Sequence, residues 1–283
     1  MSVETTGTGF SAATAISPDG DGDFAATLSP EWTVGGKPHG GYLMALLTRA
    51  GVAAVPDVAD PLAVAAHYLR PPDIGPVRLL TDVRKRGRTV NVVTVVLEQD
   101  GRSCVEAGVT TGRLPEEEPA WESLPQFAAE PPANAVTMDS KATGGVFKVG
   151  SACEVRMDPD TAGFLTGRTD VPLRLRLWAR PIGEQPDPLF ALIAGDINTP
   201  VTFNLGYYGW SPTVQLTALL RARPAAGWLR LQVDCKAVHG SWFDSDATVI
   251  DSRGRLICQS RQLALAALPV PELREKAGEE RKG

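Results

Sequence analysis

The sequence predicts an α+β fold made of two copies of one unit, each an antiparallel sheet wrapped around a buried helix. Each half holds one apolar helix candidate and several segments rich in β-branched residues. Paired motifs also recur about 151 to 153 positions apart, which indicates an internal duplication. With 283 residues the chain is long enough for two compact units of this kind.

Composition narrows the class of protein. Hydrophobic residues make up 43% of the chain and charged residues 22%, as in ordinary globular proteins. The net charge of −5 is spread along the chain, which does not favour a nucleic-acid partner. No apolar run reaches the roughly 20 residues of a membrane-spanning helix, and the polar start lacks the pattern of a secretory signal. We expect a cytoplasmic protein without a membrane span.

Cysteine and histidine are sparse and scattered. The four cysteines form no CxxC pair, which favours free thiols in a reducing compartment. The three histidines show no metal-ligand spacing, so we expect neither a metal site nor another cofactor. These residues are Cys104, Cys153, Cys235, Cys258, His39, His67 and His239.

Three shifts in composition set the expected boundaries. Residues 1–20 are small and polar and are expected to be loose. Residues 113–145 are rich in Pro, Glu and Ala and are typical of a linker, and residues 269–283 form a charged tail. Two folded blocks remain, at 20–112 and 146–268, and the candidate catalytic residues lie in the second.

The first block begins with a turn-rich stretch that leads into a helix predicted over 39–55. Because this segment is apolar on nearly every face, the helix should be buried. Strands are predicted after it, at 63–70, 77–87, 89–99 and 104–112. Between the last two, Gln99-Asp100-Gly101-Arg102 predicts a tight hairpin turn.

The second block repeats this plan with strands on both sides of its helix. Strands at 154–157 and 173–181 lead into a helix predicted over 188–198. Strands follow at 213–222, 228–238, 246–252 and 255–266. Within 228–238, apolar and polar residues alternate in the segment LRLQVD, which is typical of a half-buried strand. Two copies in one chain imply an intramolecular pseudo-dimer.

Three polar residues of the second half lack a polar counterpart in the first. Thr213 is aligned with Leu62, Gln262 is aligned with Val109, and the helix at 39–55 contains no carboxylate to match Asp196. Burying such groups costs several kcal/mol unless they satisfy one another or hold water. Asp196 also lies near the predicted end of its helix, where the dipole disfavours a negative charge and something must compensate. Purely structural roles for the three stay open.

These residue types suit the activation of a water molecule. A carboxylate can act as general base, while a Thr hydroxyl and a Gln amide can hold the water in place. The Gly40-Gly41 start of the first helix can offer N–H groups to a developing oxyanion, and His39 is its polar neighbour. The other interpretation is that Gly40-Gly41 only makes a tight turn and that His39 is structural.

At these residues the sequence resembles the acyl-CoA thioesterase II (TesB-like) family of double-hotdog enzymes. The resemblance rests on six segments in order: PHGGYLMALL, HYLRPPDIGPV, VLEQDGRSCVEA, GDIN, SPTVQLTALLRA and DSRGRLICQSRQLAL. It implies a double hotdog in which an Asp, a Thr and a Gln of the second half bind the nucleophilic water. The matching positions are Asp196, Thr213 and Gln262. It also implies an acyl-CoA substrate whose chain lies between the halves.

Several alternatives remain open at this stage. Ser211 lies in GWSPT, which lacks the second glycine of a nucleophile elbow and so disfavours a serine hydrolase. A hotdog protein that binds acyl-CoA or another lipid without hydrolysing it is the main competitor. The basic segment 84–88 could meet CoA phosphates or form a solvated loop. Whether the acyl group is carried by CoA or a carrier protein, and whether the chain forms a homo-oligomer, the sequence leaves open.

Overall fold

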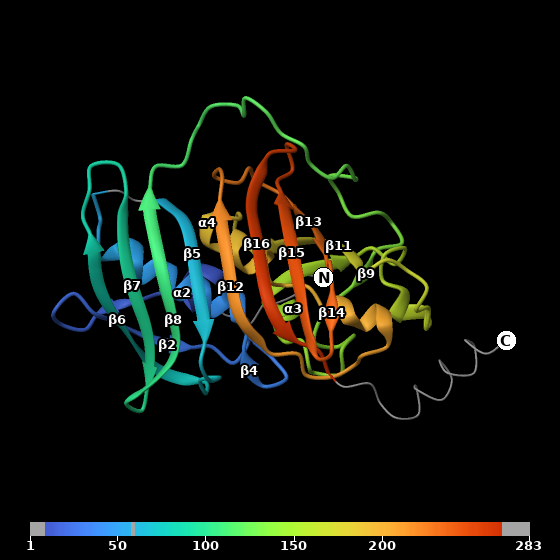
Figure 1. Ribbon diagram of the computed structural model, residues 1–283, viewed down its shortest axis with the longest axis horizontal. Helices are drawn as coiled ribbons and strands as arrows, with labels where there is room; N and C mark the ends of the chain where they lie inside the picture. Colours follow the sequence, from blue (N-terminus) through green and yellow to red (C-terminus); the bar gives the residue numbers. More distant parts are fainter. Residues whose placement is uncertain (1–8, 58–59, 268–283) are drawn as a thin grey trace.

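The computed structural model describes residues 9–57 and 60–267, so the predicted tail at 269–283 lies outside the described residues. Figure 1 shows one broad, curved antiparallel sheet with two helices, α2 and α4, packed against its concave side. Within these residues the sheet has 14 strands in the order β1-β2-β6-β7-β8-β5-β12-β16-β15-β13-β11-β10-β9, with β14 added beside β15. The predicted arrangement of antiparallel strands around buried helices is confirmed.

The first half contributes the strands on one side of this sheet and the longer helix. Helix α2 spans Gly40–Ala53, and most of its residues are buried, as its uniformly apolar sequence predicts. Its strands are β1 (Ser17–Pro18), β2 (Phe24–Leu28), β5 (Asp60–Tyr68), β6 (Gly75–Lys85), β7 (Asn91–Gln99) and β8 (Arg102–Gly112). A separate small ribbon pairs β3 (Thr33–Val34) with β4 (Lys37–Pro38) just before α2.

The predicted hairpin between β7 and β8 is confirmed, with Asp100 at φ 53° and Gly101 at φ 70°. Two successive residues in the left-handed region are the requirement of a tight hairpin turn, and Asp-Gly meets it at low cost.

The second half places a shorter helix, α4 (Pro188–Ala194), against its own strands. Two short 3₁₀ helices flank this region, η1 (Gly163–Thr166) and η2 (Val201–Leu205), and α3 (Val149–Ala152) precedes β10. The strands are β9 (Val136–Thr137), β10 (Cys153–Met157), β11 (Arg174–Pro181), β12 (Thr213–Leu220), β13 (Leu229–Asp234), β14 (Val238–His239), β15 (Trp242–Ile250) and β16 (Leu256–Leu265).

The two halves join at one seam, where β5 pairs antiparallel with β12 in the middle of the sheet. Helices α2 and α4 also contact each other behind this seam. A cross-half ion pair between Arg223 and Asp60 lies near the end of the seam. The two halves therefore share one continuous sheet.

The strand pairings sharpen the internal repeat. A β-bulge interrupts β5 between Pro61 and Ala63, and a matching bulge interrupts β12 between Thr213 and Gln215. Aligning the bulges places Thr213 opposite Pro61 in the repeat, so its alignment with Leu62 was wrong by one residue. The reason is that the sequence comparison matched Pro61 with Pro212, two prolines that the strand register separates by one residue. Neither Pro61 nor Leu62 carries a hydroxyl, so the asymmetry itself remains.

The expectation that residues 1–20 are loose was wrong for the described part of this segment. Helix α1 (Phe10–Ala13) buries Phe10 to 1% exposure, and its ring lies 5.4 Å from that of Phe190 in α4. One aromatic residue in a polar context is enough to anchor the segment, because burying a side chain of this size stabilises by about 2 kcal/mol.

Part of the expected linker, at 113–145, also lies on the second half. The segment leaves the upper end of β8 and arcs above the ends of the neighbouring strands toward the second half (Figure 1). The Phe127 ring then packs edge-on against Trp178, and the Trp178 indole N–H donates to the Ala128 carbonyl at 2.9 Å. Its later residues include β9, which pairs with β10.

Candidate functional site

The candidate site centres on Asp196, which follows the end of α4. This helix begins with Asp187, whose carboxylate accepts from the Phe190 N–H, and with Pro188 at the first helical position. It ends at Ala194, four residues before the predicted bound at 198, so Asp196 lies just beyond the helix. The Asp196 side chain is 6% exposed and therefore needs partners for its carboxylate.

The partner comes from the opposite half of the chain. The Gly41 N–H, in the first turn of α2, donates to Asp196 Oδ2 at 2.6 Å. The start of a 14-residue helix carries positive partial charge and free N–H groups, so it stabilises a carboxylate. This contact supplies the compensation expected for Asp196, because its carboxylate meets the favourable end of α2 although the residue itself follows the unfavourable end of α4.

Two glycines make this approach sterically possible. A Cβ added to Gly40 would lie 2.8 Å from Asp196 Oδ2, and one added to Gly41 would lie 3.0 Å from Asp196 Cβ and from Ile193 Cα. Any larger residue would push the carboxylate or α4 away. The Gly40-Gly41 pair therefore does more than make a turn, since it admits a carboxylate to the backbone of the helix.

His39 lies at the same junction and is buried, with 7% exposure. Its Nδ1 accepts from the Tyr42 N–H at 3.3 Å and so caps α2. That bond places the ring proton on Nε2, which lies 3.1 Å from the Asp196 carbonyl oxygen and 3.6 Å from Oδ2. His39 thus combines the structural role that the sequence favoured with direct contact to Asp196.

Burial raises the pKa of Asp196 above its ordinary value, and the His39 ring and the Gly41 N–H act in the opposite direction. A carboxylate with a raised pKa is a stronger base at neutral pH than an exposed one.

The other two predicted residues form a pair on adjacent strands. The Thr213 hydroxyl, on β12, donates to Gln262 Oε1, on β16, at 2.7 Å. This leaves the Thr213 oxygen as an acceptor and the Gln262 NH₂ group as a donor. Gln262 is 8% exposed, whereas its counterpart Val109 is fully buried in the core of the first half.

Ser260 connects this pair to the Asp196 segment. Its hydroxyl donates to the Gly195 carbonyl at 2.6 Å, immediately before Asp196. Because alternate residues of a strand share a face, Ser260 and Gln262 both point toward the end of α4, about 7 Å apart along β16. The structure therefore brings His39 and Gly41 into direct contact with Asp196, and Ser260 connects the strand that carries Gln262 to the residue before Asp196.

The sequence reasoning missed Tyr68, at the end of β5. Its hydroxyl donates to the Gly40 carbonyl at 2.8 Å. In the repeat Tyr68 aligns with Leu220, by the same spacing that aligns Ala66 with Ala218. It is thus another polar residue without a polar counterpart. The criterion that identified Asp196 would have found Tyr68 had it been applied to the first half as well.

Other candidate residues lie apart from this site. The Ser211 hydroxyl donates to the Leu265 carbonyl at 2.6 Å, and His67 and His239 are exposed. The basic segment 84–88 follows β6, and Arg86 donates to the Ala54 carbonyl at the far end of α2. A helix of 14 residues puts it roughly 20 Å from Gly41. Within residues 9–57 and 60–267 no group of three His, Cys, Asp or Glu side chains is placed to hold a metal.

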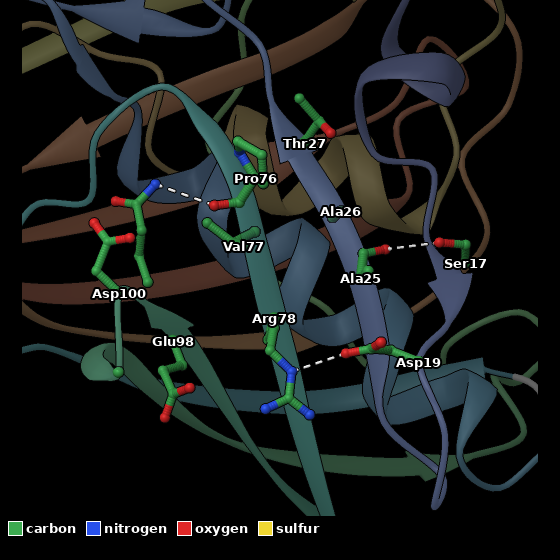
Figure 2. Close-up of a pocket in the computed structure, with 12 residues that line it drawn as sticks. Ser17, Asp19, Ala25, Ala26, Thr27, Pro76, Val77, Arg78, Glu98 and Asp100 are labelled. Atoms are coloured by element: carbon green, nitrogen blue, oxygen red, sulfur yellow. Dashed lines mark hydrogen bonds and ion pairs between the residues drawn. The ribbon is translucent and has the colours of Figure 1, made fainter.

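A surface groove of about 660 Å³ lies at the edge of the first half, away from Asp196. Figure 2 shows its walls, formed by β2 and β6 beside the β7–β8 turn, with Arg78 paired to Asp19 across it. Arg78 and Asp19 are exposed and pair with each other. The groove therefore lacks a buried carboxylate like that of Asp196.

Comparison with known proteins gives consistent matches to both halves. Residues 28–112 match the family described as acyl-CoA thioesterase N-terminal domain, and residues 124–266 match the acyl-CoA thioesterase C-terminal domain. An uncharacterised protein of Mycobacterium tuberculosis is 41% identical over 265 residues, which cover 86% of this chain and 90% of that protein.

Solved structures show the same similarity. A candidate thioesterase II from Thermobifida fusca superposes with a TM-score of 0.83 at 33% identity, covering 92% of this chain and 97% of that one. A hotdog-fold protein of unknown function from Alicyclobacillus acidocaldarius gives a TM-score of 0.79 at 21% identity, covering 92% and 98%. The second likeness concerns the fold alone. In the described part of the chain, no helix is long and apolar enough to cross a membrane.

Proposed function

Because the chain belongs to the acyl-CoA thioesterase family, we propose that it hydrolyses an acyl-CoA to the free acid and CoA at the Asp196 site. The observation that carries the assignment is the hydrogen bond from the Gly41 N–H of one half to the Asp196 carboxylate of the other. This bond holds a buried carboxylate at the start of a helix, and in the proposal Asp196 activates a water molecule together with the Thr213–Gln262 pair.

The pairing of Thr213 with Gln262 defines how a water would be held. With its own proton donated to Gln262 Oε1, the Thr213 oxygen accepts one proton of the water, and Asp196 accepts the other. The Gln262 NH₂ group donates to the water oxygen. One lone pair of the water is then left for attack on the thioester carbon, and the geometry of the three groups sets its direction.

The reaction balances with these groups alone. As the water oxygen bonds to the thioester carbon, Asp196 takes its proton and the carbonyl oxygen becomes an oxyanion. Collapse of this intermediate breaks the carbon–sulfur bond, and the CoA thiolate takes the proton back from Asp196. The raised pKa of Asp196 favours the first transfer, because it makes the carboxylate a stronger proton acceptor.

The oxyanion donor needs a more specific assignment than the sequence allowed. Gly41 was expected to polarise the carbonyl, but in this structure its N–H is occupied by Asp196. The Gly40 N–H, one residue earlier, has no hydrogen bond among the described residues. We assign Gly40 to the oxyanion and Gly41 to the base, with His39 fixing the start of the helix for both.

The proposal extends to the architecture. The chain is a double hotdog, with hotdog units at 20–112 and 146–268 joined by the segment 113–145, and one site formed between them. Support comes from the matched bulges in β5 and β12, from one helix per half, and from family matches that divide the chain near the same place. Acyl-CoA, or an acyl group on a carrier protein, is the proposed substrate.

The first test is CoA release from a panel of acyl-CoAs, short to long, by wild type and Asp196→Asn. We expect kcat to fall by about 100-fold or more, because general base catalysis contributes roughly 10²–10⁴. Asp246→Asn is the matched control, since Asp246 pairs with Arg261 in an exposed ion pair and should keep full activity.

Thiol detection needs a protein blank, because Cys235 is only half-buried. Tight acyl-CoA binding without turnover by either protein would refute hydrolysis and favour the binding-protein alternative. Equal turnover by wild type and Asp196→Asn would instead show that another residue is the base.

A further inference from the structure

The Gly40–Gly41 peptide group is hydrogen-bonded at both ends by side chains from different elements. Its carbonyl accepts from the Tyr68 hydroxyl of β5 at 2.8 Å, and its N–H donates to Asp196 Oδ2 at 2.6 Å. The phenol, the peptide and the carboxylate therefore form one continuous chain of hydrogen bonds that crosses from the sheet through the start of α2 to the opposite half.

Such a chain has a direction. A donor on the carbonyl oxygen of an amide draws electron density toward that oxygen and makes the N–H of the same amide a stronger donor. The Gly41 N–H to Asp196 bond is at the short end of the range for N–H···O bonds, as expected for a charge-assisted contact. Tyr68 lies at the neutral, donating end of this chain, and the negative charge lies at the other.

We propose that Tyr68 is a positioning residue for the reaction, acting through the Gly40–Gly41 peptide to hold and stabilise the ionised Asp196 carboxylate. This inference rests on the proposed function for its catalytic meaning, and on the two hydrogen bonds for its geometry. Tyr68 does not touch Asp196 by any described hydrogen bond, so its effect is transmitted by the peptide.

Two further observations fit this role. Burial raises the pKa of Tyr68 well above its ordinary value, and the negative charge of Asp196 raises it further, so the phenol stays a neutral donor while Asp196 is ionised. His39, from the residue before α2, and Tyr68, from β5, are the titratable groups that the described contacts place against the Asp196 carboxylate. A change in the titration of Asp196 on altering Tyr68 is therefore interpretable.

The test compares Tyr68→Phe with wild type over the pH range of acyl-CoA hydrolysis. Loss of one neutral hydrogen bond should lower kcat by about 3- to 10-fold. The acid limb of kcat/KM should move to higher pH, because the carboxylate loses part of its stabilisation and its pKa rises. KM should stay within about twofold, since the hydroxyl is not expected to bind substrate.

Tyr42→Phe is the matched control. The Tyr42 hydroxyl donates to the Ala13 carbonyl at 2.8 Å, the same kind of buried bond from the first turn of α2, and points away from the Gly40–Gly41 peptide. It should lower thermal stability without moving the pH profile. A purely structural Tyr68 would behave like Tyr42, with a lower Tm and an unchanged acid limb, and that result would overturn the proposal.

A second measurement keeps the inference independent of turnover. The Asp196 carboxyl carbon and the Gly41 amide proton can be followed by NMR in wild type and Tyr68→Phe without substrate. We expect a higher Asp196 pKa and an upfield Gly41 proton in the variant, which is the signature of a weaker hydrogen bond. Identical titrations would refute the relay even if the enzyme is active. A clear difference would support it even if no acyl-CoA is hydrolysed, in which case the proposed function alone fails.

Discussion

The N-termini of α2 and α4 occupy equivalent places in the two halves, but they are capped and packed in different ways. At α4 the chain supplies its own cap, Asp187, and Phe10 of α1 packs against Phe190 in the first turn. Helix α2 instead begins with Gly40 and Gly41, which have no side chains, and the carboxylate that meets them comes from the other half. Of the two helix starts, only the one without side chains admits a carboxylate from the other half.

The ends of the helices differ in a complementary way. Nine residues after its N-cap, α2 is still helical at Thr48, whose hydroxyl donates to the Met44 carbonyl of its own helix at 2.7 Å. In the second half, Asp196 lies nine residues after the N-cap Asp187, but α4 has already ended at Ala194. A shorter helix therefore frees one side chain to leave its own half. The difference between the halves lies in where a helix stops as much as in which residue follows it.

The largest effect should come from filling the open helix start. Gly41→Ala places a Cβ 3.0 Å from Asp196 Cβ, so the carboxylate must shift and its bond to residue 41 must lengthen. A displacement near 1 Å costs about 100-fold in rate. Gly51→Ala is the steric control, because its Cβ would lie 2.9 Å from Val109 at the other end of α2.

Both alanines should lower the free energy of unfolding by about 1–3 kcal/mol, the usual range for overpacking. Only Gly41→Ala should lower kcat by more than the fraction of unfolded protein accounts for. Equal kcat values for the two folded variants would remove the functional distinction between the two ends of α2.

A smaller effect is expected from making the second half resemble the first at one position. Gln262→Val installs the residue found at Val109 and removes the amide that would hold the water. We expect kcat to fall by about 10- to 100-fold, as for the loss of a positioning group. Circular dichroism and a thermal melt should show an intact fold, because valine suits a half-buried strand. Retention of full activity would exclude Gln262 from the water site.

The smallest effect concerns stability and pH. Burial raises the pKa of Asp196 above that of the unfolded chain, so the folded state holds this proton to higher pH. Stability from this group is therefore present at low pH and is lost as pH rises through the folded pKa. Urea unfolding of wild type and Asp196→Asn, from about pH 4 upward, should show the variant gaining relative stability with pH. A constant difference would mean that the carboxylate ionises without cost.

The sequence predicted what depends on local patterns. The uniformly apolar run of α2 indicated a buried helix, and Asp100-Gly101 indicated the hairpin turn, because both signals act over a few neighbouring residues. The family resemblance is confirmed by the matches to both halves. The strand β2 was missed because its five residues pair only with distant β6 and short β1 and show no clear alternation.

What escaped prediction depends on contacts between distant parts of the chain. The end of α4 was placed too late because Ile197 continues the apolar pattern beyond Gly195. The destination of Asp196 depends on the start of α2, 155 positions earlier, and no local pattern reveals it. Tyr68 was missed for the same reason, since its importance follows only from the Gly40 carbonyl that it reaches. The roles of Asp196, Thr213 and Gln262 stay predictions.

The hydrogen bond between Gly41 and Asp196 also bears on when the chemistry arises during folding. It spans 155 residues and exists only once β5 and β12 have paired. Contacts of such long range form late, because the entropy of closing the intervening chain must be offset first. A nascent or refolding chain will therefore form its helices and hairpins before the Gly41 N–H meets the Asp196 carboxylate. If Asp196 is the base, as proposed, catalytic competence is a property of the docked pair, and neither half carries it alone.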